Sequence, residues 1–253
     1  MMPVFTIASP LEQFEIIALI PLTFLGLNFS ITNSVLFMLI AFLISTTWIS
    51  LSLHRNSLIP NNWQLLKESI YEITSNIVQD NIGSKGEYYF PFVFTLHLFL
   101  LFCNLIGMIP YSFTVTSHIS FTFGLALSIF IGINIIGVQT HGIKFFALFL
   151  PRGVPLPIVP LLVTIEFLSY IVKVFTLSIR LFANMTSGHT LLKIIAGFAW
   201  TMLSAGGLLA VFHLIPLALL VALIGLELAI AGLQAYVFTL LTCIYLNDVL
   251  ELH

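Results

Sequence analysis

The feature that most constrains this chain is a long apolar run from residue 160 to 196 that carries a single arginine, Arg180, near its middle. A helix of that length measures about 55 Å at 1.5 Å per residue, whereas the hydrocarbon layer of a membrane is about 30 Å thick. An arginine at mid-membrane costs between about 2.5 and more than 10 kcal/mol, and its guanidinium does not lose its proton. Arg180 is therefore the first candidate functional residue.

Composition places the whole chain in a membrane. Hydrophobic residues make up 59% of it and charged residues only 7%, whereas soluble domains are about 25% charged. Two-residue alternation is absent and the apolar runs far exceed the strands of about 10 residues in membrane barrels, so the backbone is expected to form helices. The net charge of −2 offers no footprint for a nucleic acid. Cys103 and Cys243 lie in separate apolar runs and are expected to be buried thiols.

The chain reads as an all-α polytopic membrane protein with one membrane domain over residues 1–253. Its expected parts are an N-terminal segment (1–30), a first span (31–53), an amphipathic surface helix (62–82), a helical hairpin (90–138) and a second, longer hairpin (160–249). The spans at 31–53, 90–109 and 119–138 are expected to stand upright. Glu12 and Glu15 argue against a transit peptide, which favours synthesis beside the protein's own membrane over import.

The last two apolar segments, 160–196 and 208–249, are separated by Gly197 and by Gly206 and Gly207. Both are longer than a bilayer is thick, so either each breaks into two spans or each crosses at a steep tilt. No proline or charged turn interrupts residues 161–196. This favours a hairpin of two long, strongly tilted helices.

The basic residues predict the orientation. Arg55, Lys67 and Lys85 fall in one loop, and Lys144 and Arg152 fall in another on the same side of the predicted topology. Because positively charged loops stay on the inner side of a membrane, these loops are predicted to lie inside. Five crossings then put the N-terminus outside and the C-terminus inside.

Polar residues of the last two segments gather on one face of each predicted helix. At about 100° per residue, the first face holds Glu166, Ser169, Lys173, Thr176, Arg180, Asn184 and Ser187, and the second holds His213, Glu227, Gln234 and Tyr245, with Asp248 at its edge. The two faces either face each other or face a common partner.

Each polar residue also has a structural interpretation. Ser, Thr and Asn often join membrane helices, whereas intramembrane Glu, Lys and Arg indicate function. Glu166 and Lys173 either act in function or form an ion pair with each other. His189 lies opposite Arg180 on the helical wheel, so it is either a packing residue or a proton relay. Polar residues of the other spans are expected to pack or to join helices: His97, Asn104, His118 and Asn134.

Depth along the hairpin separates the titratable residues into two sets. His189 and His213 lie toward its tip, Glu166 and Asp248 lie toward its far ends, and Arg180 and Glu227 lie between. The fixed cation repels a proton that would pass directly from one set to the other, so protons are expected to cross only on a carrier. The sequence contains no P-loop and no cluster of metal ligands, so no ATP hydrolysis site, cofactor or metal is expected in this chain.

Several strings of residues resemble one family. The stretch Ile179–His189, which reads IRLFANMTSGH, resembles the signature of subunit a (subunit 6) of F-type ATP synthases, and residues 226–230 and 234–238 resemble its second block. Residues 9–15, 104–113 and 155–162 resemble further segments of the same subunit. The resemblance implies a proton-translocating stator in which two tilted helices lie against a ring of c subunits. It implies two offset half-channels that load and unload protons on the ring carboxylates and so couple proton flow to ATP synthesis.

The resemblance also implies a role for each site residue. Arg180 would take protons from the ring carboxylates and block leakage, and Gln234 would lie close to it. His189, Glu227 and Asn184 would line the half-channel open to the intermembrane space, and Glu166 and Asp248 would line the half-channel open to the matrix. Lys173 stands where some mitochondrial relatives have arginine.

The pairing of His189 with Glu227 resembles the mitochondrial branch of the family. It implies a multi-pass protein of the mitochondrial inner membrane, with its N-terminus in the intermembrane space and its C-terminus in the matrix. The implied partners are the c-ring, subunit b of the peripheral stalk, subunit 8 and membrane lipid. Two other classes are weighed against it. A proton-coupled secondary transporter should show paired half-repeats and an enclosed substrate site, which the sequence lacks, and a structural anchor needs no polar face.

Overall fold

The computed structural model describes residues 9, 11–21, 23–24, 27–28, 30–53, 61–109, 112–143, 145, 158–207 and 209–251. Three of the basic residues that predict the orientation, Arg55, Lys144 and Arg152, lie outside these residues. So does the segment 151–157, where three prolines predict a break.

The described chain is helical from residue 33 onward. Its helices are α1 (Asn33–Leu53), α2 (Asn62–Ile82), α3 (Phe90–Gly107), α4 (Ile119–His141), α5 (Val159–Ala205), α6 (Leu209–Phe212) and α7 (Leu214–Leu250), with the short 3-10 turns η1 (Glu12–Phe14), η2 (Gly83–Tyr89) and η3 (Val115–Ser117). Among the described residues, five helical stretches are long and apolar enough to cross a membrane, and one of them is α2 continued through η2 into α3. The prediction of an all-α polytopic membrane protein is confirmed.

The segment before α1 forms two small strand pairs that the sequence did not predict. β1 (Ala18–Ile20) pairs with β4 (Ile31–Thr32), and β2 (Thr23–Phe24) pairs with β3 (Leu27–Asn28), both antiparallel. The Asn33 side chain fixes this segment to the start of α1, because its Nδ2 donates to the carbonyl of Glu15 at 3.0 Å while its Oδ1 accepts from the amide of Ile17 at 3.3 Å.

Helix α2 has the bounds predicted for the amphipathic helix. The Asn61 side chain accepts from the amide of Asn62 at 2.8 Å at its start, and Gly83, at φ 72°, ends it because glycine adopts positive φ without strain. Its second half is buried against the bundle through Thr74, Ile77, Val78 and Ile82, whereas Trp63 at its start is exposed.

A shared apolar core joins α3, α4, α5 and α7. Its buried members include Val93 and Leu100 of α3, Ala126 and Ile133 of α4, Leu177 and Leu181 of α5, and Phe238 and Leu246 of α7.

Polar side chains cross-link the same helices. Asn104 Nδ2 donates to the carbonyl of Ala231 at 3.1 Å, and His97 Nδ1 lies 3.2 Å from Thr239 Oγ1. Tyr170 donates its hydroxyl to Asn134 Oδ1 at 2.9 Å. The joining roles predicted for His97, Asn104 and Asn134 are confirmed.

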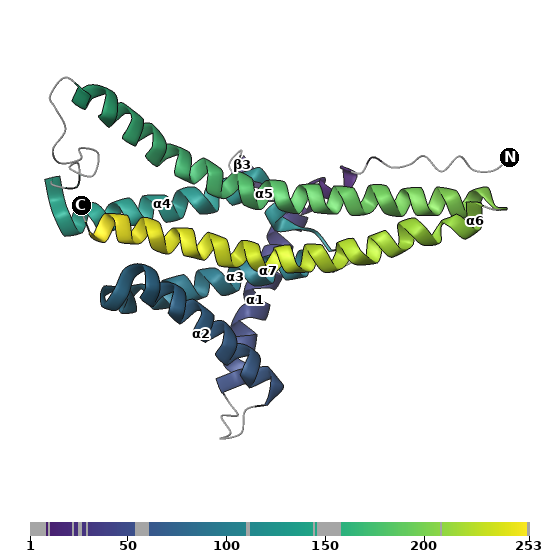
Figure 1. Ribbon diagram of the computed structural model, residues 1–253, viewed down its shortest axis with the longest axis horizontal. Coiled ribbons are helices and arrows are strands. Elements are labelled where there is room, and N and C mark those ends of the chain that lie inside the picture. The colour runs from purple at the N-terminus through teal and green to yellow at the C-terminus, as the bar shows by residue number, and fades with distance from the viewer. Residues whose placement is uncertain are drawn as a thin grey trace.

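The long hairpin is the dominant feature of the fold. In Figure 1, α5 (green) and α7 (yellow) run side by side over most of their length, and α3 and α4 lie along one half of α7. The predicted continuity of residues 161–196 is confirmed, since α5 is one helix of 47 residues. In the same view α1 crosses the direction of the hairpin. The inclination of each span in the membrane stays a prediction.

Two boundaries of the hairpin differ from the prediction. The first segment was expected to end at residue 196, but α5 continues through Gly197 to Ala205, because one glycine inside a helix costs only about 1 kcal/mol. The helix ends at Gly206 and Gly207, which have φ of 69° and 63°. The second segment was expected to be continuous, but α6 ends at Phe212. Pro216 has no amide hydrogen to donate to the carbonyl of Phe212, so the helix is interrupted there and α7 begins at Leu214.

Candidate functional site in the long hairpin

The two polar faces predicted for the hairpin lie in different environments. On α5, Glu166, Ser169, Thr176, Arg180 and Ser187 are exposed, and Lys173 and Asn184 are half-buried. On α7, Glu227 and Gln234 are buried, with exposed fractions of 8% and 6%. The two faces meet at Lys173, whose ammonium bonds Asp248 and lies over the ring of Tyr245, whereas the Arg180 side chain is exposed on the surface of this chain.

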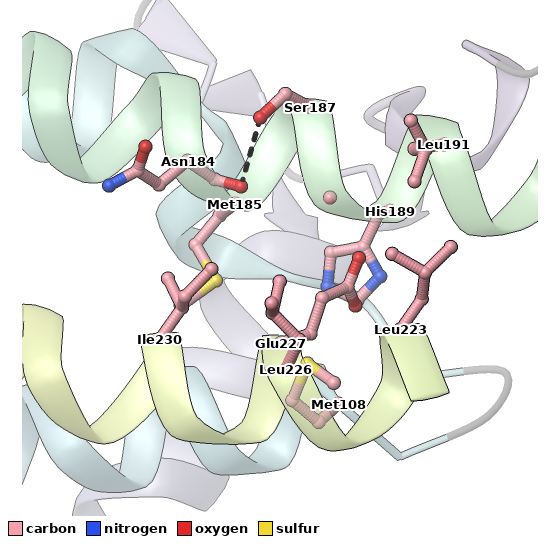
Figure 2. A pocket seen from close by; sticks show the side chains of 11 residues that line it. Met108, Asn184, Met185, Ser187, His189, Leu191, Leu223, Leu226, Glu227 and Ile230 are labelled. Atoms are coloured by element: carbon pink, nitrogen blue, oxygen red, sulfur yellow. Dashed lines mark hydrogen bonds between the residues drawn. The ribbon is translucent and has the colours of Figure 1, made fainter. Parts of the chain in front are cut away.

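Glu227 lies in a cavity of about 190 Å³ between α5 and α7 (Figure 2). Asn184 and His189 of α5 line the same cavity, and Met108 closes it from the end of α3. Within the described part of the chain, both Glu227 carboxylate oxygens and His189 Nε2 have no hydrogen-bond partner. Buried polar atoms in native proteins almost always bond to protein or water, and a cavity of this size has room for several water molecules. The cavity is therefore suited to proton exchange through water.

Gly188 makes room for the Glu227 carboxylate. A Cβ atom at position 188 would lie 2.5 Å from Glu227 Oε1 and 2.9 Å from its Cδ, well inside van der Waals contact. The carboxylate thus lies directly against the backbone of α5, one residue from His189. The sequence shows that Gly188 precedes His189. Only the packing of α5 against α7 shows that this glycine leaves room for the Glu227 carboxylate.

We expect the Gly188→Ala variant to reduce proton flux through the assembled complex by about tenfold or more, because displacing a reacting group by about 1 Å has effects of that order. The double variant Gly188→Ala with Glu227→Asp should recover part of the flux, since aspartate is one methylene shorter. Gly197→Ala is the matched control, because its added Cβ would have nothing within 4 Å. Proton uptake by membrane vesicles measures all three. Equal flux in the single and double variants would show that crowding of the carboxylate is not the cause.

A second polar cluster lies closer to the start of α5. Lys173 Nζ forms a 3.0 Å salt bridge with Asp248 Oδ2 of α7. The same ammonium lies 4.9 Å from the ring centroid of Tyr245 and 5.8 Å from that of Tyr170. The alternative in which Lys173 pairs with Glu166 is wrong, because the antiparallel return of α7 offers Asp248 instead and Glu166 is exposed.

The structure thus brings the predicted residues into two groups. Glu227, His189 and Asn184 share the cavity, and Lys173 and Asp248 form the ion pair. Arg180 lies along α5 between these groups. His189, which the helical wheel places opposite Arg180, borders the cavity. Among the described residues, no group of three or more His, Cys, Asp or Glu could hold a metal ion.

Similar proteins decide the family. The profile of the ATP synthase A chain family matches residues 35–247. This chain belongs to that family. It is 82% identical over 249 residues to "ATP synthase subunit a" of Chondrus crispus, covering 98% of both chains. It is 54% identical to the protein of that name from Marchantia polymorpha, covering 97% of this chain and 99% of the relative. It is 48% identical to the one from Pelagibacter ubique, covering 97% and 98%.

Membership confirms the family identified from the sequence strings. The chain is a proton-translocating stator subunit of the Fo sector, where it works with the c-ring and other Fo subunits. The secondary-transporter alternative is not favoured, because the family match extends over residues 35–247 of the chain.

Proposed function

We propose that this subunit loads protons onto the c-ring through the Glu227 cavity and unloads them along the cluster of Lys173 and Asp248, with Arg180 as the barrier between the two paths. One observation carries the proposal: Arg180 is on the exposed face of α5, while Glu227 is buried between α5 and α7.

The loading path uses the groups that line the cavity. The carboxylate of Glu227 and the imidazole of His189 both titrate, and the Asn184 amide both donates and accepts hydrogen bonds. A proton that reaches Glu227 through water passes to a ring carboxylate and neutralises it. The neutral carboxyl can then enter lipid, because burial of the uncharged form costs far less than burial of the anion.

Arg180 acts on a ring carboxylate when the rotation of the ring returns that carboxylate to the stator. An exposed guanidinium at mid-membrane needs an anionic partner, and a ring carboxylate supplies one. The attraction favours the ionised form of that carboxyl, so its proton leaves. Gln234, buried on α7, would lie close to Arg180 and help to hold its side chain in place. The same fixed charge repels a proton that would pass from the cavity straight to the unloading path.

The unloading path leads toward the start of α5. Asp248 accepts the released proton, and Lys173 holds this carboxylate at 3.0 Å. Glu166, exposed two turns before Lys173, passes the proton on to the aqueous side. Each charge that crosses the full membrane potential releases about 2.3 kcal/mol per 100 mV, so several protons are needed for each ATP.

We place the protein in the mitochondrial inner membrane, with its N-terminus in the intermembrane space and its C-terminus in the matrix. The distribution of basic residues supports this orientation. The pairing of His189 with Glu227 supports the mitochondrial assignment. Subunit b of the peripheral stalk and subunit 8 are the further proposed partners, together with lipid.

Cysteine cross-linking tests where the ring lies. Thr176→Cys and Ser187→Cys place thiols on the exposed face that carries Arg180, and both should cross-link to a c subunit with a short bifunctional reagent in native membranes. Phe42→Cys on α1 is the matched control, since Phe42 is 54% exposed but is not part of the hairpin. Cys103 and Cys243 are buried and should not react. If Phe42→Cys cross-links to the c subunit as efficiently as the two α5 variants do, the proposed interface is contradicted.

A further inference from the structure

In the turn between α3 and α4, residues 113–117 are buried, and Thr114, Thr116 and Ser117 carry hydroxyl groups. Ser112 Oγ donates to the carbonyl of Ile106 at 2.6 Å and so caps α3. Ser117 Oγ donates to the carbonyl of Thr114 at 2.6 Å. Thr116 differs from these residues, because its side chain is 0% exposed and its Oγ1 has no hydrogen-bond partner within the described residues.

This turn borders a second cavity. The cavity measures about 120 Å³ and is lined by Val115 of the turn, Ile16 of the N-terminal segment, Ser34 of α1 and His118 at the start of α4. The same turn contacts α5, since Thr186 Oγ1 donates to the carbonyl of Ser117 at 3.2 Å. Thr186 lies between Met185 and Ser187, which both line the Glu227 cavity.

Unpartnered buried polar atoms occur in the smaller cavity, in the turn and in the Glu227 cavity. His118 Nε2 lacks a partner in the smaller cavity, Thr116 Oγ1 lacks one in the turn, and His189 Nε2 and both Glu227 oxygens lack one in the larger cavity, all counted within the described part of the chain. Such atoms usually bond to ordered water. Burial lowers the pKa of His118, so the ring is neutral near pH 7 and has one donor and one acceptor nitrogen. The ring is held in place by stacking on Phe113 at 5.1 Å between centroids.

We propose that Thr116 and His118 hold a file of water that carries protons from the smaller cavity to Glu227. This inference rests on the proposed function, because it names the entrance to the same loading path. Thr116 is a positioning residue: its hydroxyl donates to one water and accepts from the next. Each water passes on one proton as it receives another, so nothing is consumed.

Three threonine variants test the role of the hydroxyl. Thr116→Val keeps the shape and removes the hydroxyl, so passive proton conduction by Fo in vesicles stripped of F1 should fall about fivefold, the factor that corresponds to one lost hydrogen bond. Thr116→Ser keeps the hydroxyl and should conduct like the wild type. Thr122→Val is the matched control, because Thr122 is also 0% exposed but its hydroxyl lies within 3.3 Å of the carbonyls of His118 and Ile119 in its own helix turn. It should leave conduction unchanged.

A fourth variant tests the inference at the smaller cavity. His118→Phe keeps the stacking on Phe113 and removes both ring nitrogens, and we expect a similar fall in conduction. Wild-type conduction in Thr116→Val, or equal loss in Thr116→Val and Thr116→Ser, would overturn the inference. Glu227→Gln is measured in parallel. If it slows conduction while Thr116→Val and His118→Phe do not, this entrance is wrong and the loading site stands. If Glu227→Gln has no effect, the proposed function itself fails.

Discussion

Replacing Arg180 with alanine should abolish proton-driven ATP synthesis while the complex still assembles. Arg180 is exposed on α5 and lies outside the apolar core that joins the helices, so its loss should leave the packing of this subunit intact. Without the guanidinium, a ring carboxylate that returns to the stator has no cation to draw off its proton. The barrier between the two paths is also lost. ATP synthesis driven by an imposed proton gradient in reconstituted vesicles measures the first effect, and passive proton leak measures the second.

The control for Arg180 lies one turn away on the same face. Thr176 is also exposed, and its hydroxyl donates to carbonyls of its own helix at 2.9 and 3.1 Å. Thr176→Val should therefore keep ATP synthesis near the wild-type rate. Arg180→Lys keeps the charge but replaces a planar, bidentate donor by a point charge that can lose its proton, so it should restore little coupling. Coupled synthesis at the wild-type rate in Arg180→Ala would refute the assigned role.

Glu227→Gln should slow proton flux by about a hundredfold to ten-thousandfold, the range expected when a group that transfers protons is removed. Glutamine keeps the size of the side chain and its fit against Gly188, but it no longer carries a transferable proton. ATP-driven acidification of vesicles and passive conduction by Fo should fall together, because both need the same loading step. The amount of assembled complex, measured by its ATP hydrolysis in detergent, should not change.

An exposed glutamate provides the matched control for Glu227. Glu87 lies in η2 and is exposed, so Glu87→Gln removes the same charge away from the hairpin and should leave flux unchanged. If Glu227→Gln and Glu87→Gln conduct equally, Glu227 is not on the path.

Much of the fold was predictable from residue patterns. The apolar runs predicted α1, α3, α4 and α5 to within a few residues at most ends, and the amphipathic helix 62–82 was predicted with its observed bounds. The errors lie where a single residue type has two possible effects. Gly197 predicts a boundary, yet a helix tolerates one glycine. The apolar run 208–249 predicts one continuous segment, yet Pro216 separates α6 from α7.

The site was predictable in kind but not in pairing. Intramembrane charges identified Arg180, Glu227 and Asp248 as candidates because burying a charge in lipid is costly whatever the fold. The partner of Lys173 was not predictable, because Asp248 lies 75 residues away and the alternative, Glu166, is on the same helix. The role of Gly188 was not predictable from the sequence, because the space that a glycine leaves matters only where another atom occupies it.

The sequence by itself determined that this chain is a helical membrane protein, which residues carry charge into the bilayer, and to which family it belongs. These follow from transfer energies and local strings of residues, which do not depend on how the helices meet. Only the tertiary structure decided that Arg180 stays on the outer face, that Glu227 lies against Gly188 in a cavity, and that Lys173 bonds Asp248. Those facts depend on the register and rotation of α7 against α5, which are set by packing between residues far apart in the chain.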